Sequence, residues 1–226
     1  FHPQVGVERE GETLYVQQLR MRERCREEAE YVIWDVGLGA AGNAIVALKA
    51  VDEAGCARAK VVSFDRTVGA LLFALEHRDK MPYLNGWHDR IEQLLEDGTA
   101  EFEMPNGCRV TWENVIGDFP TLLETSAVGT WPQPHAVMYD AFSPAKCPLM
   151  WTSSTLASLR SHVGGGVHSL LSTSSRSTIV RATLLLAGFF VGKGTPTGGT
   201  AYRAKEETTT AATHLGLLSA PLGEDW

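Results

Sequence analysis

The stretch Tyr31-Val-Ile-Trp-Asp-Val-Gly-Leu-Gly-Ala-Ala-Gly-Asn-Ala-Ile45 decides the fold of this chain. Residues 31–36 are mostly aromatic and β-branched, which is typical of a buried strand. The turn that follows holds three glycines with only small residues between them: Gly37, Gly39 and Gly42. A helical pattern then runs from Asn43 to about Asp52. A strand, a glycine turn and a helix form the first unit of an open α/β nucleotide-binding sheet, although an ordinary tight turn would give the same pattern.

A second acidic strand end sharpens this interpretation. Lys60-Val-Val-Ser-Phe-Asp65 is a short apolar strand, and an acid about 20 residues past the glycines is placed to bind the two hydroxyls of a ribose. NAD and S-adenosylmethionine (SAM) both carry such a ribose, so Asp65 does not separate a dehydrogenase from a methyltransferase. Asp35 stands just before Gly37, where it can reach the positively charged methionine end of SAM and would repel a pyrophosphate. The turn therefore favours SAM.

The composition indicates one globular domain of 226 residues, 44% of them hydrophobic and 21% charged. No apolar run is long enough to span a bilayer, and no signal peptide opens the chain. The four cysteines form no Cys-x-x-Cys pair and the histidines have no ligand spacing, so we expect reduced thiols, no metal site and a cytoplasmic protein. We expect a single domain over residues 1–226, with a strand-and-helix extension (1–30), a Rossmann-like core (31–213) and a tail (214–226).

The charge is unevenly distributed along the chain. The whole chain carries a net charge of −7, yet residues 141–205 contain no Asp or Glu. This stretch holds the basic residues Lys146, Arg160, Arg176, Arg181, Lys193, Arg203 and Lys205. Such asymmetry can place a positive face on an acidic protein, and a polyanion could bind to that face. Basic residues dispersed over the surface would give the same sequence pattern.

Periodicity predicts the remaining elements only coarsely. We expect strands at 13–16, 167–171, 188–191 and 207–213, with a further strand-like segment at 109–112. We expect helices at 17–30, 67–79, 83–96, 152–161 and 179–187, the third of them ended by Gly98.

Two further strand ends carry candidate site residues. Asp118-Phe119 follows a strand-like segment and suits an adenine ring, with Asp118 accepting from the exocyclic amine and Phe119 packing on the ring; a helix cap by Asp118 is equally compatible. Pro134-His-Ala-Val-Met-Tyr-Asp140 is a strand that ends in an acid. The proline-containing loop after it, residues 141–151, lies where α/β sheets place their active sites.

At Tyr139-Asp-Ala-Phe-Ser-Pro-Ala-Lys-Cys-Pro-Leu-Met-Trp-Thr152 the sequence resembles the methyltransferase module of the MnmC-type tRNA modification enzymes. The corresponding loop of that family reads Asp-Gly-Phe-Ala-Pro-x-Lys-Asn-Pro-x-Met-Trp. Its opening turn, Gly-x-Gly-x-Gly-x-Asn, is matched by Gly37, Gly39 and Asn43, with Ala41 in place of the third glycine. Its Val-Arg-Arg…Ala-Gly-Phe block is matched by Val180-Arg181 and Ala187-Gly188-Phe189. The departures are Ser143, Cys147 and Ala182, in place of Ala, Asn and Arg.

The resemblance implies a Rossmann-like class I SAM-dependent methyltransferase, an α/β fold with a mostly parallel twisted sheet covered by helices on both faces. It also implies a reaction: methylation of the amine of 5-aminomethyl-(2-thio)uridine at the tRNA wobble position. Bifunctional members carry a fused FAD-dependent oxidase, and we expect this chain to be the stand-alone form, a monomer without FAD or metal. A separate enzyme would then supply the aminomethyl group.

The chemistry of amine methylation assigns roles to these residues. The amine must lose a proton before it attacks, and Asp140 is the candidate to accept that proton, unless it only caps the loop. Lys146 can contact phosphate, and Phe142 and Trp151 can wall a uridine pocket, although core packing is the default for aromatics. Three basic residues are candidates for tRNA phosphates: Arg176, Arg181 and Lys205. A methyltransferase of a small-molecule amine and a non-catalytic SAM- or RNA-binding protein remain as alternatives.

Overall fold

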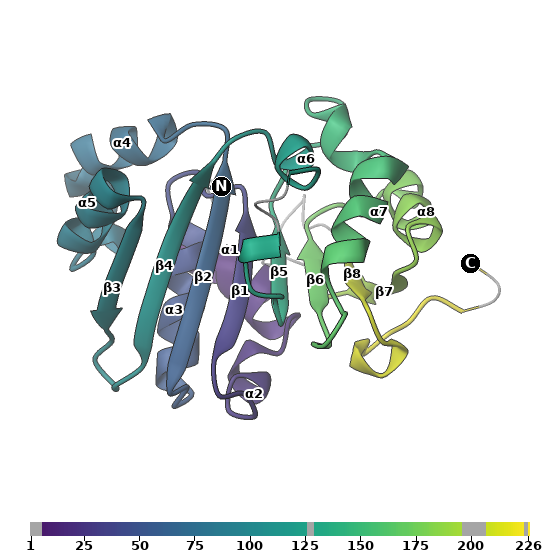
Figure 1. Ribbon diagram of the computed structural model, residues 1–226, viewed down its shortest axis with the longest axis horizontal. Coiled ribbons are helices and arrows are strands. Elements are labelled where there is room, and N and C mark those ends of the chain that lie inside the picture. Colours follow the sequence, from purple (N-terminus) through teal and green to yellow (C-terminus); the bar gives the residue numbers. More distant parts are fainter. Residues whose placement is uncertain (1–5, 126–128, 196–206, 224–225) are drawn as a thin grey trace.

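The computed structural model describes residues 6–125, 129–195, 207–223 and 226. Within them, eight strands form one sheet in the order β3-β4-β2-β1-β5-β6-β8-β7 (Figure 1). The strands are β1 Tyr31–Val36, β2 Arg58–Asp65, β3 Thr99–Glu103, β4 Arg109–Ile116, β5 Ala136–Tyr139, β6 Leu170–Thr173, β7 Phe190–Gly194 and β8 Thr208–Ala212. The five central strands, from β4 to β6, are parallel, whereas β3 and β8 run antiparallel to their neighbours. The expected mostly parallel α/β sheet is confirmed.

Strand β1 lies at the centre because it pairs in parallel with both β2 and β5. The chain builds the sheet outward from β1 in one direction through β2 and β4 and then returns to β5 on its other side. At such a reversal the loops after the two strands diverge and leave a crevice at their carboxyl ends. The topology therefore places a crevice directly above the glycine turn.

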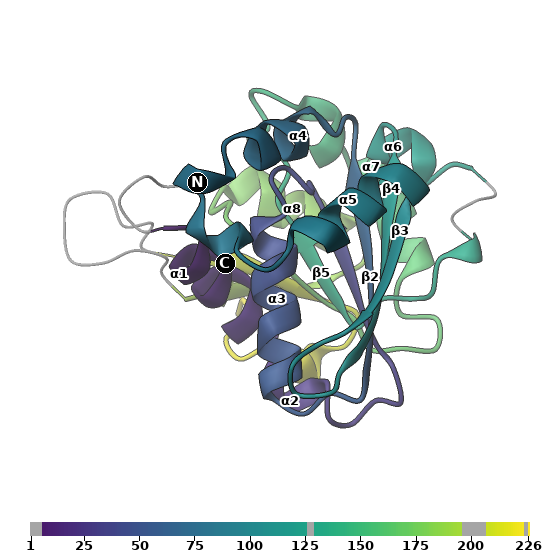
Figure 2. The ribbon, with the colours of Figure 1, turned by 90° about the vertical axis from the view of Figure 1, so that its left-hand side faces the viewer.

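Helices cover both faces of the sheet. All six residues of β1 are buried, because Tyr31 and Ile33 pack into one helical layer while Val32, Trp34 and Val36 pack into the other. The first layer contains α3 Gly42–Glu53, α4 Gly69–Glu76 and α5 His88–Asp97, and the second contains α6 Phe119–Leu122, α7 Ser153–His162 and α8 Thr178–Leu186. Figure 2 shows α3 running along its face of the sheet, with α1 beside it. No helix of the described segments is long and apolar enough to cross a membrane.

The N-terminal extension differs from its prediction. Residues 13–16 were expected to form a strand, but they belong to the π-helix η1, Glu12–Gln17, which follows α1, Val7–Gly11. The helix expected at 17–30 is only one turn long, α2 Met21–Arg24, because Arg20 takes a left-handed conformation (φ 51°) that breaks it. Leu14, Tyr15 and Val16 are all buried, and a run of consecutive buried residues gives no periodicity that would separate a helix from a strand.

Elsewhere the predicted elements exist with shifted ends. The helix expected at 83–96 is split into a 3-10 turn, η3 Pro82–Leu84, and α5. Gly98 ends α5 in the left-handed conformation (φ 72°), as predicted. Strand β3 was not predicted. The remaining short helices are η2 Arg78–Lys80, η5 Pro148–Trp151 and η6 Leu215–Leu217.

Candidate active site

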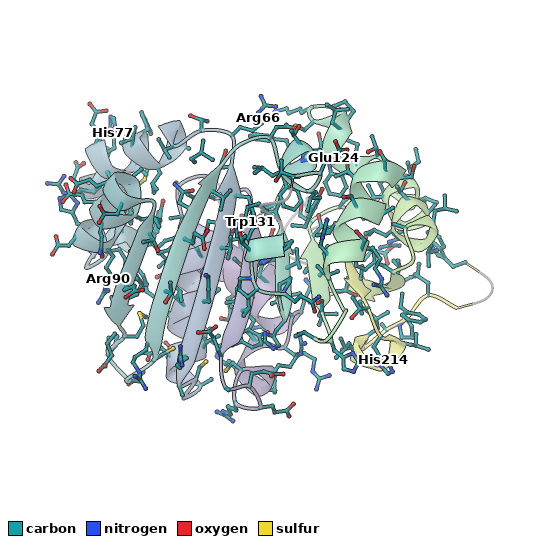
Figure 3. The ribbon with its side chains drawn as sticks, in the orientation of Figure 1. Arg66, His77, Arg90, Glu124, Trp131 and His214 are labelled. Carbon is teal, nitrogen blue, oxygen red and sulfur yellow. The ribbon has the colours of Figure 1, made fainter. Side chains whose placement is uncertain are left out.

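A cavity of about 580 Å³ opens at the carboxyl ends of the parallel strands, where the topology predicts one. The turn after β1, the residues after β2, the loop after β5 and the N-terminal helices all contribute to its wall. Its lining includes Glu10, Leu14, Tyr15, Gly37, Gly39, Asn43, Asp65, Arg66, Gly117, Phe119, Asp140, Phe142, Lys146, Cys147 and Met150. Figure 3 shows Arg66 at this edge of the sheet. A second hollow of about 500 Å³, lined by Glu30, Arg58 and Arg109 among others, lies at the opposite ends of the strands.

The glycine turn forms the floor of the cavity with bare backbone. Gly37 (φ 106°), Gly39 (φ 53°) and Ala41 (φ 63°) all adopt left-handed conformations. A Cβ atom on Gly37 would lie 3.0 Å from the carbonyl oxygen of Asp140, so only glycine fits between the two strand ends. Ala41 is the N-cap residue of α3, whose first amides therefore face the cavity. This arrangement is suited to a ligand that lies close against the backbone.

Asp65 joins the end of β2 to the glycine turn. Its Oδ2 accepts a hydrogen bond from the Gly39 amide at 2.9 Å, and its Oδ1 accepts one from the Arg66 amide at 2.7 Å. The side chain is half-buried at the cavity wall and keeps acceptor capacity for two further donors, such as vicinal hydroxyls. The sequence-based prediction that Asp65 and the glycines share one site is consistent with this geometry.

Asp140 projects into the cavity at the end of β5. The Asn43 side-chain amide donates to its Oδ2 at 2.8 Å. Asp140 is exposed to the cavity, and its pKa is raised by desolvation from the surrounding protein, a shift that the side chains of Tyr15 and Asn43 oppose. A carboxylate with a raised pKa is a better proton acceptor than an ordinary surface aspartate.

Asp35 does not reach the cavity, in contrast to its prediction. Its side chain is fully buried beneath the glycine turn, where Ser63 Oγ donates to Oδ2 at 2.9 Å and Trp112 Nε1 donates in turn to Ser63 Oγ. Burial raises the pKa of Asp35 to about 7, against the hydrogen bond from Ser63, with Asp140 and Asp65 adding to the rise. Asp35 therefore makes no direct contact with the cavity.

The pair Asp118-Phe119 is divided between two environments. Phe119 lines the cavity and packs edge-on against Phe64 and Tyr139. Asp118 lies outside the lining at the N-cap position of α6, and its Oδ2 accepts a hydrogen bond from the Thr121 hydroxyl at 3.0 Å. The alternative of a helix-cap position for Asp118 therefore describes its geometry better than a place in the cavity wall.

The loop after β5 contains one buried aromatic residue, Trp151, and one exposed aromatic residue, Phe142. Trp151 is buried, packs edge-on against Tyr139, and donates from Nε1 to the Phe142 carbonyl at 2.7 Å. It therefore anchors the loop and lies outside the cavity lining, so of the two readings of Trp151, pocket wall or core packing, the structure fits core packing. Phe142 lines the cavity with 72% of its surface exposed, and the Lys146 ammonium lies 5.8 Å from the centre of its ring.

The three candidates for phosphate contact differ in where they lie. Arg181 is buried, and its guanidinium donates to Thr209 Oγ1 and to the Thr208 carbonyl, both at 3.0 Å. It therefore ties α8 to β8 and is not free to meet a polyanion, contrary to its prediction. Arg176 is exposed ahead of α8 but lies outside the cavity lining. Lys205 falls outside the described residues.

Comparison with known proteins assigns the family. The model of a family described as S-adenosyl-L-methionine-dependent methyltransferase matches residues 86–213, more than half of the chain. The chain belongs to this family. It is 30% identical to the "tRNA 5-methylaminomethyl-2-thiouridine biosynthesis bifunctional protein MnmC" of Pseudomonas putida (strain GB-1), over 83% of this chain and 29% of that protein. The chain therefore spans less than a third of the relatives it matches, a second of which, from strain W619, is 25% identical over 96% of this chain and 32% of its own length.

A solved structure supports the same fold for this methyltransferase. The crystal structure of MNMC2 from Aquifex aeolicus has a TM-score of 0.67 to this chain at 23% identity, covering 96% of this chain and 63% of that one. The cavity also fits SAM on its own features. It offers bare backbone at the glycine turn, a carboxylate at Asp65 and an aromatic side chain at Phe119.

Several lining residues of this methyltransferase were not identified from the sequence. Tyr15 was missed because its segment was assigned to a strand outside the core. Arg66 follows Asp65 directly, so its position next to a predicted ligand residue was a usable signal. Cys147 and Met150 belong to the loop that the family resemblance singled out, yet only the fold shows that they face the cavity.

Buried Asp35 makes stability depend on pH. The unfolded carboxyl has an ordinary pKa of 3.8 and the folded one about 7, so the folded state holds the proton more tightly between these values. Stability should therefore fall as pH rises from about 4 to 7, by roughly 1.4 kcal/mol per pH unit at most. We predict that Asp35→Asn abolishes this component, so that the wild type loses roughly 3 kcal/mol more than the variant between pH 5 and pH 8 in urea unfolding. Parallel pH profiles for the two proteins would contradict the assignment.

Arg181 and Arg176 should differ in their contribution to stability. Arg181→Ala leaves the buried acceptors at Thr208 and Thr209 unpaired and should cost about 3 kcal/mol, whereas Arg176→Ala, at an exposed site, should cost less than about 0.5 kcal/mol. Chemical denaturation of both variants tests this difference. Equal midpoints would show that Arg181 does not hold α8 and β8 together.

Proposed function

We propose that this methyltransferase transfers the methyl group of SAM to the amine of 5-aminomethyl-(2-thio)uridine at the wobble position of tRNA. The relatives that match its sequence are named for the biosynthesis of 5-methylaminomethyl-2-thiouridine in tRNA. The observation that carries the proposal is the position of Asp140, a carboxylate with a raised pKa at the cavity wall, beside the glycine turn and the exposed Phe142.

In this proposal the cavity holds SAM along the turn after β1. Asp65 accepts hydrogen bonds from the ribose hydroxyls, and the adenine ring packs on Phe119. The amides of Gly42 and Asn43 at the N-terminus of α3 receive the carboxylate of the methionine part. SAM supplies an electrophilic methyl group on a positively charged sulfur, which Asp140 faces from across the turn.

Asp140 then prepares the acceptor amine. An alkylamine with a pKa of roughly 10 is neutral in only about one molecule in a thousand at pH 7. Asp140 accepts the proton from the ammonium group, and the freed lone pair attacks the methyl carbon while the carbon–sulfur bond pair leaves with sulfur. The hydrogen bond from Asn43 keeps the carboxylate oriented during this exchange.

The loop after β5 presents the base. Phe142 is exposed at the mouth of the cavity and offers a face on which the uracil ring can stack, with Trp151 holding the loop from below. Lys146 lies beside that ring and can contact a phosphate, and Arg176 and Lys205 are placed in the same role in this proposal. The protein would act as a cytoplasmic monomer on tRNA that a separate enzyme has aminomethylated.

The direct test is methyl transfer from labelled SAM to tRNA that carries 5-aminomethyluridine, followed by nucleoside analysis. We expect 5-methylaminomethyluridine from the wild type, and at least about a hundredfold lower rate from Asp140→Ala, because the amine then lacks its proton acceptor. Labelled SAM that binds without labelling this nucleoside would contradict the proposal, and activity on small amines without RNA would favour a small-molecule methyltransferase.

Phe142 gives a second test with a control in the same loop. Phe142→Ala should raise the KM for tRNA roughly tenfold, because one base–aromatic stack is lost, and should leave the affinity for SAM unchanged. Leu149 is also exposed but lies outside the cavity lining, so Leu149→Ala should leave both values at the wild-type level. Equal KM values for the two variants would remove Phe142 from the substrate site.

A further inference from the structure

The N-terminal helices place one tyrosine in the cavity wall. Tyr15 lies on η1, is 1% exposed, and lines the cavity together with Leu14 and Glu10. Its hydroxyl is buried but makes no hydrogen bond of good geometry within the described structure. Because a buried polar group without a partner costs free energy, such a group at a binding site indicates a partner that arrives with the ligand or by a small rotation.

The segment that carries Tyr15 is firmly attached to the sheet. Ser172 Oγ on β6 donates to the Leu14 carbonyl at 2.7 Å, and the Thr208 hydroxyl on β8 donates to Gln18 at 2.8 Å. Gly11 packs closely on Val46 of α3. The position of Tyr15 is therefore set by both the sheet and α3, and this segment lies outside the residues that the family model matches.

Tyr15 and Asp140 both line the cavity, and their side chains interact electrostatically. Burial is the largest reason that the pKa of Tyr15 is raised well above 10, and the charge of Asp140 adds to it. Tyr15 therefore stays protonated and remains a donor at all physiological pH values. The other groups that face Asp140 are Asn43 from α3, Glu10 from α1 and Asp35 from β1, with Lys146 in the same cavity wall. Asn43 favours the ionised carboxylate, as Tyr15 does, whereas Glu10 disfavours it.

We propose that Tyr15 is a positioning residue for the methyl-transfer reaction, whose hydroxyl donates to the Asp140 carboxylate together with Asn43 when the site is loaded. The effect of Tyr15 on the reaction rests on the proposed function, whereas the contact between the Tyr15 hydroxyl and the Asp140 carboxylate does not. With two donors, the carboxylate stays ionised and directed at the amine. It accepts the ammonium proton, the amine lone pair forms the bond to the methyl carbon, and the carbon–sulfur pair returns to sulfur.

The chain offers a matched control. Tyr31 on β1 is also fully buried with a hydroxyl that has no hydrogen-bond partner in the described structure, but it stacks on His135 and lies outside the cavity lining. Tyr15→Phe and Tyr31→Phe therefore remove the same atom from equally buried sites. A purely structural effect should appear in both variants, whereas an effect on Asp140 should appear only in the first.

The first measurement is independent of the methyl acceptor. The pKa of Asp140 is followed by carbon NMR of its carboxyl group in the protein saturated with S-adenosylhomocysteine, with Asp140→Asn used for the assignment. We expect Tyr15→Phe to shift this pKa upward, since a donor to the ionised form is lost, and Tyr31→Phe to leave it at the wild-type value. The affinity for S-adenosylhomocysteine, within about threefold of the wild type, confirms that each variant is folded. A pKa that does not move in Tyr15→Phe overturns the inference.

The second measurement is the pH dependence of methyl transfer to 5-aminomethyluridine tRNA. Tyr15→Phe should lower kcat about tenfold at pH 7 and move the acid limb of kcat/KM to higher pH, with the KM for SAM unchanged. An acid limb that coincides with that of the wild type and of Tyr31→Phe overturns the role of Tyr15. If the wild type does not methylate this tRNA, the proposed function fails, and the NMR titration still decides the contact between Tyr15 and Asp140.

Discussion

The close approach of Gly37 to the Asp140 carbonyl is the contact on which the site depends. Because β1 and β5 are adjacent parallel strands, their carboxyl ends arrive side by side, and the backbone after β1 must turn away at once. Only a residue without a Cβ can do so at φ 106° with a carbonyl 3.0 Å from where that atom would be. The same turn exposes the amides of α3 and sets Asn43 against Asp140. One steric constraint thus builds the floor and orients the carboxylate.

The electrostatics of the cavity follow from its acids. Asp65 and Asp140 line it, with Glu10 at its wall and Asp35 buried beneath it. Desolvation raises the pKa of both Asp140 and Asp35; the charges of Asp140 and Asp65 add to the rise at Asp35, and that of Glu10 adds to the rise at Asp140. A site of this kind gains most from a positively charged ligand, because each cation offsets the repulsion between carboxylates. The sulfonium group of SAM and the ammonium group of the proposed acceptor are two such ligands. The charge of the cavity therefore suits both the cofactor of the family and the proposed amine acceptor.

The sequence could predict those elements whose conformation follows from residues close together in the chain. The glycine turn, β1, β2 and the acids at strand ends follow from short-range rules, since glycine spacing and strand composition need no knowledge of the rest of the chain. The prediction that Asp35 reaches the ligand was wrong because no local pattern shows that its side chain is enclosed. Its enclosure follows only from the packing of Ser63 and Trp112 against it. The role of Arg181 likewise depends on β8, which lies 27 residues farther along the chain.

The N-terminal segment shows the limit of such reasoning most clearly. Three consecutive buried residues, Leu14, Tyr15 and Val16, are as compatible with a strand as with a helix, and their partners on α3, β6 and β8 are distant in sequence. Tyr15 therefore enters the site only through tertiary structure. Trp151 is the converse case: the sequence left it open between a pocket wall and core packing, and its bond to the Phe142 carbonyl shows that it holds the loop.

The most direct test of this account is a crystal structure of the protein with S-adenosylhomocysteine. We expect the ribose hydroxyls on the Asp65 carboxylate, the adenine ring on Phe119, and the sulfur atom facing Asp140 across the glycine turn. A ligand whose sulfur points away from Asp140, or one bound at the opposite ends of the strands, would contradict the assignment of this cavity as the site of methyl transfer.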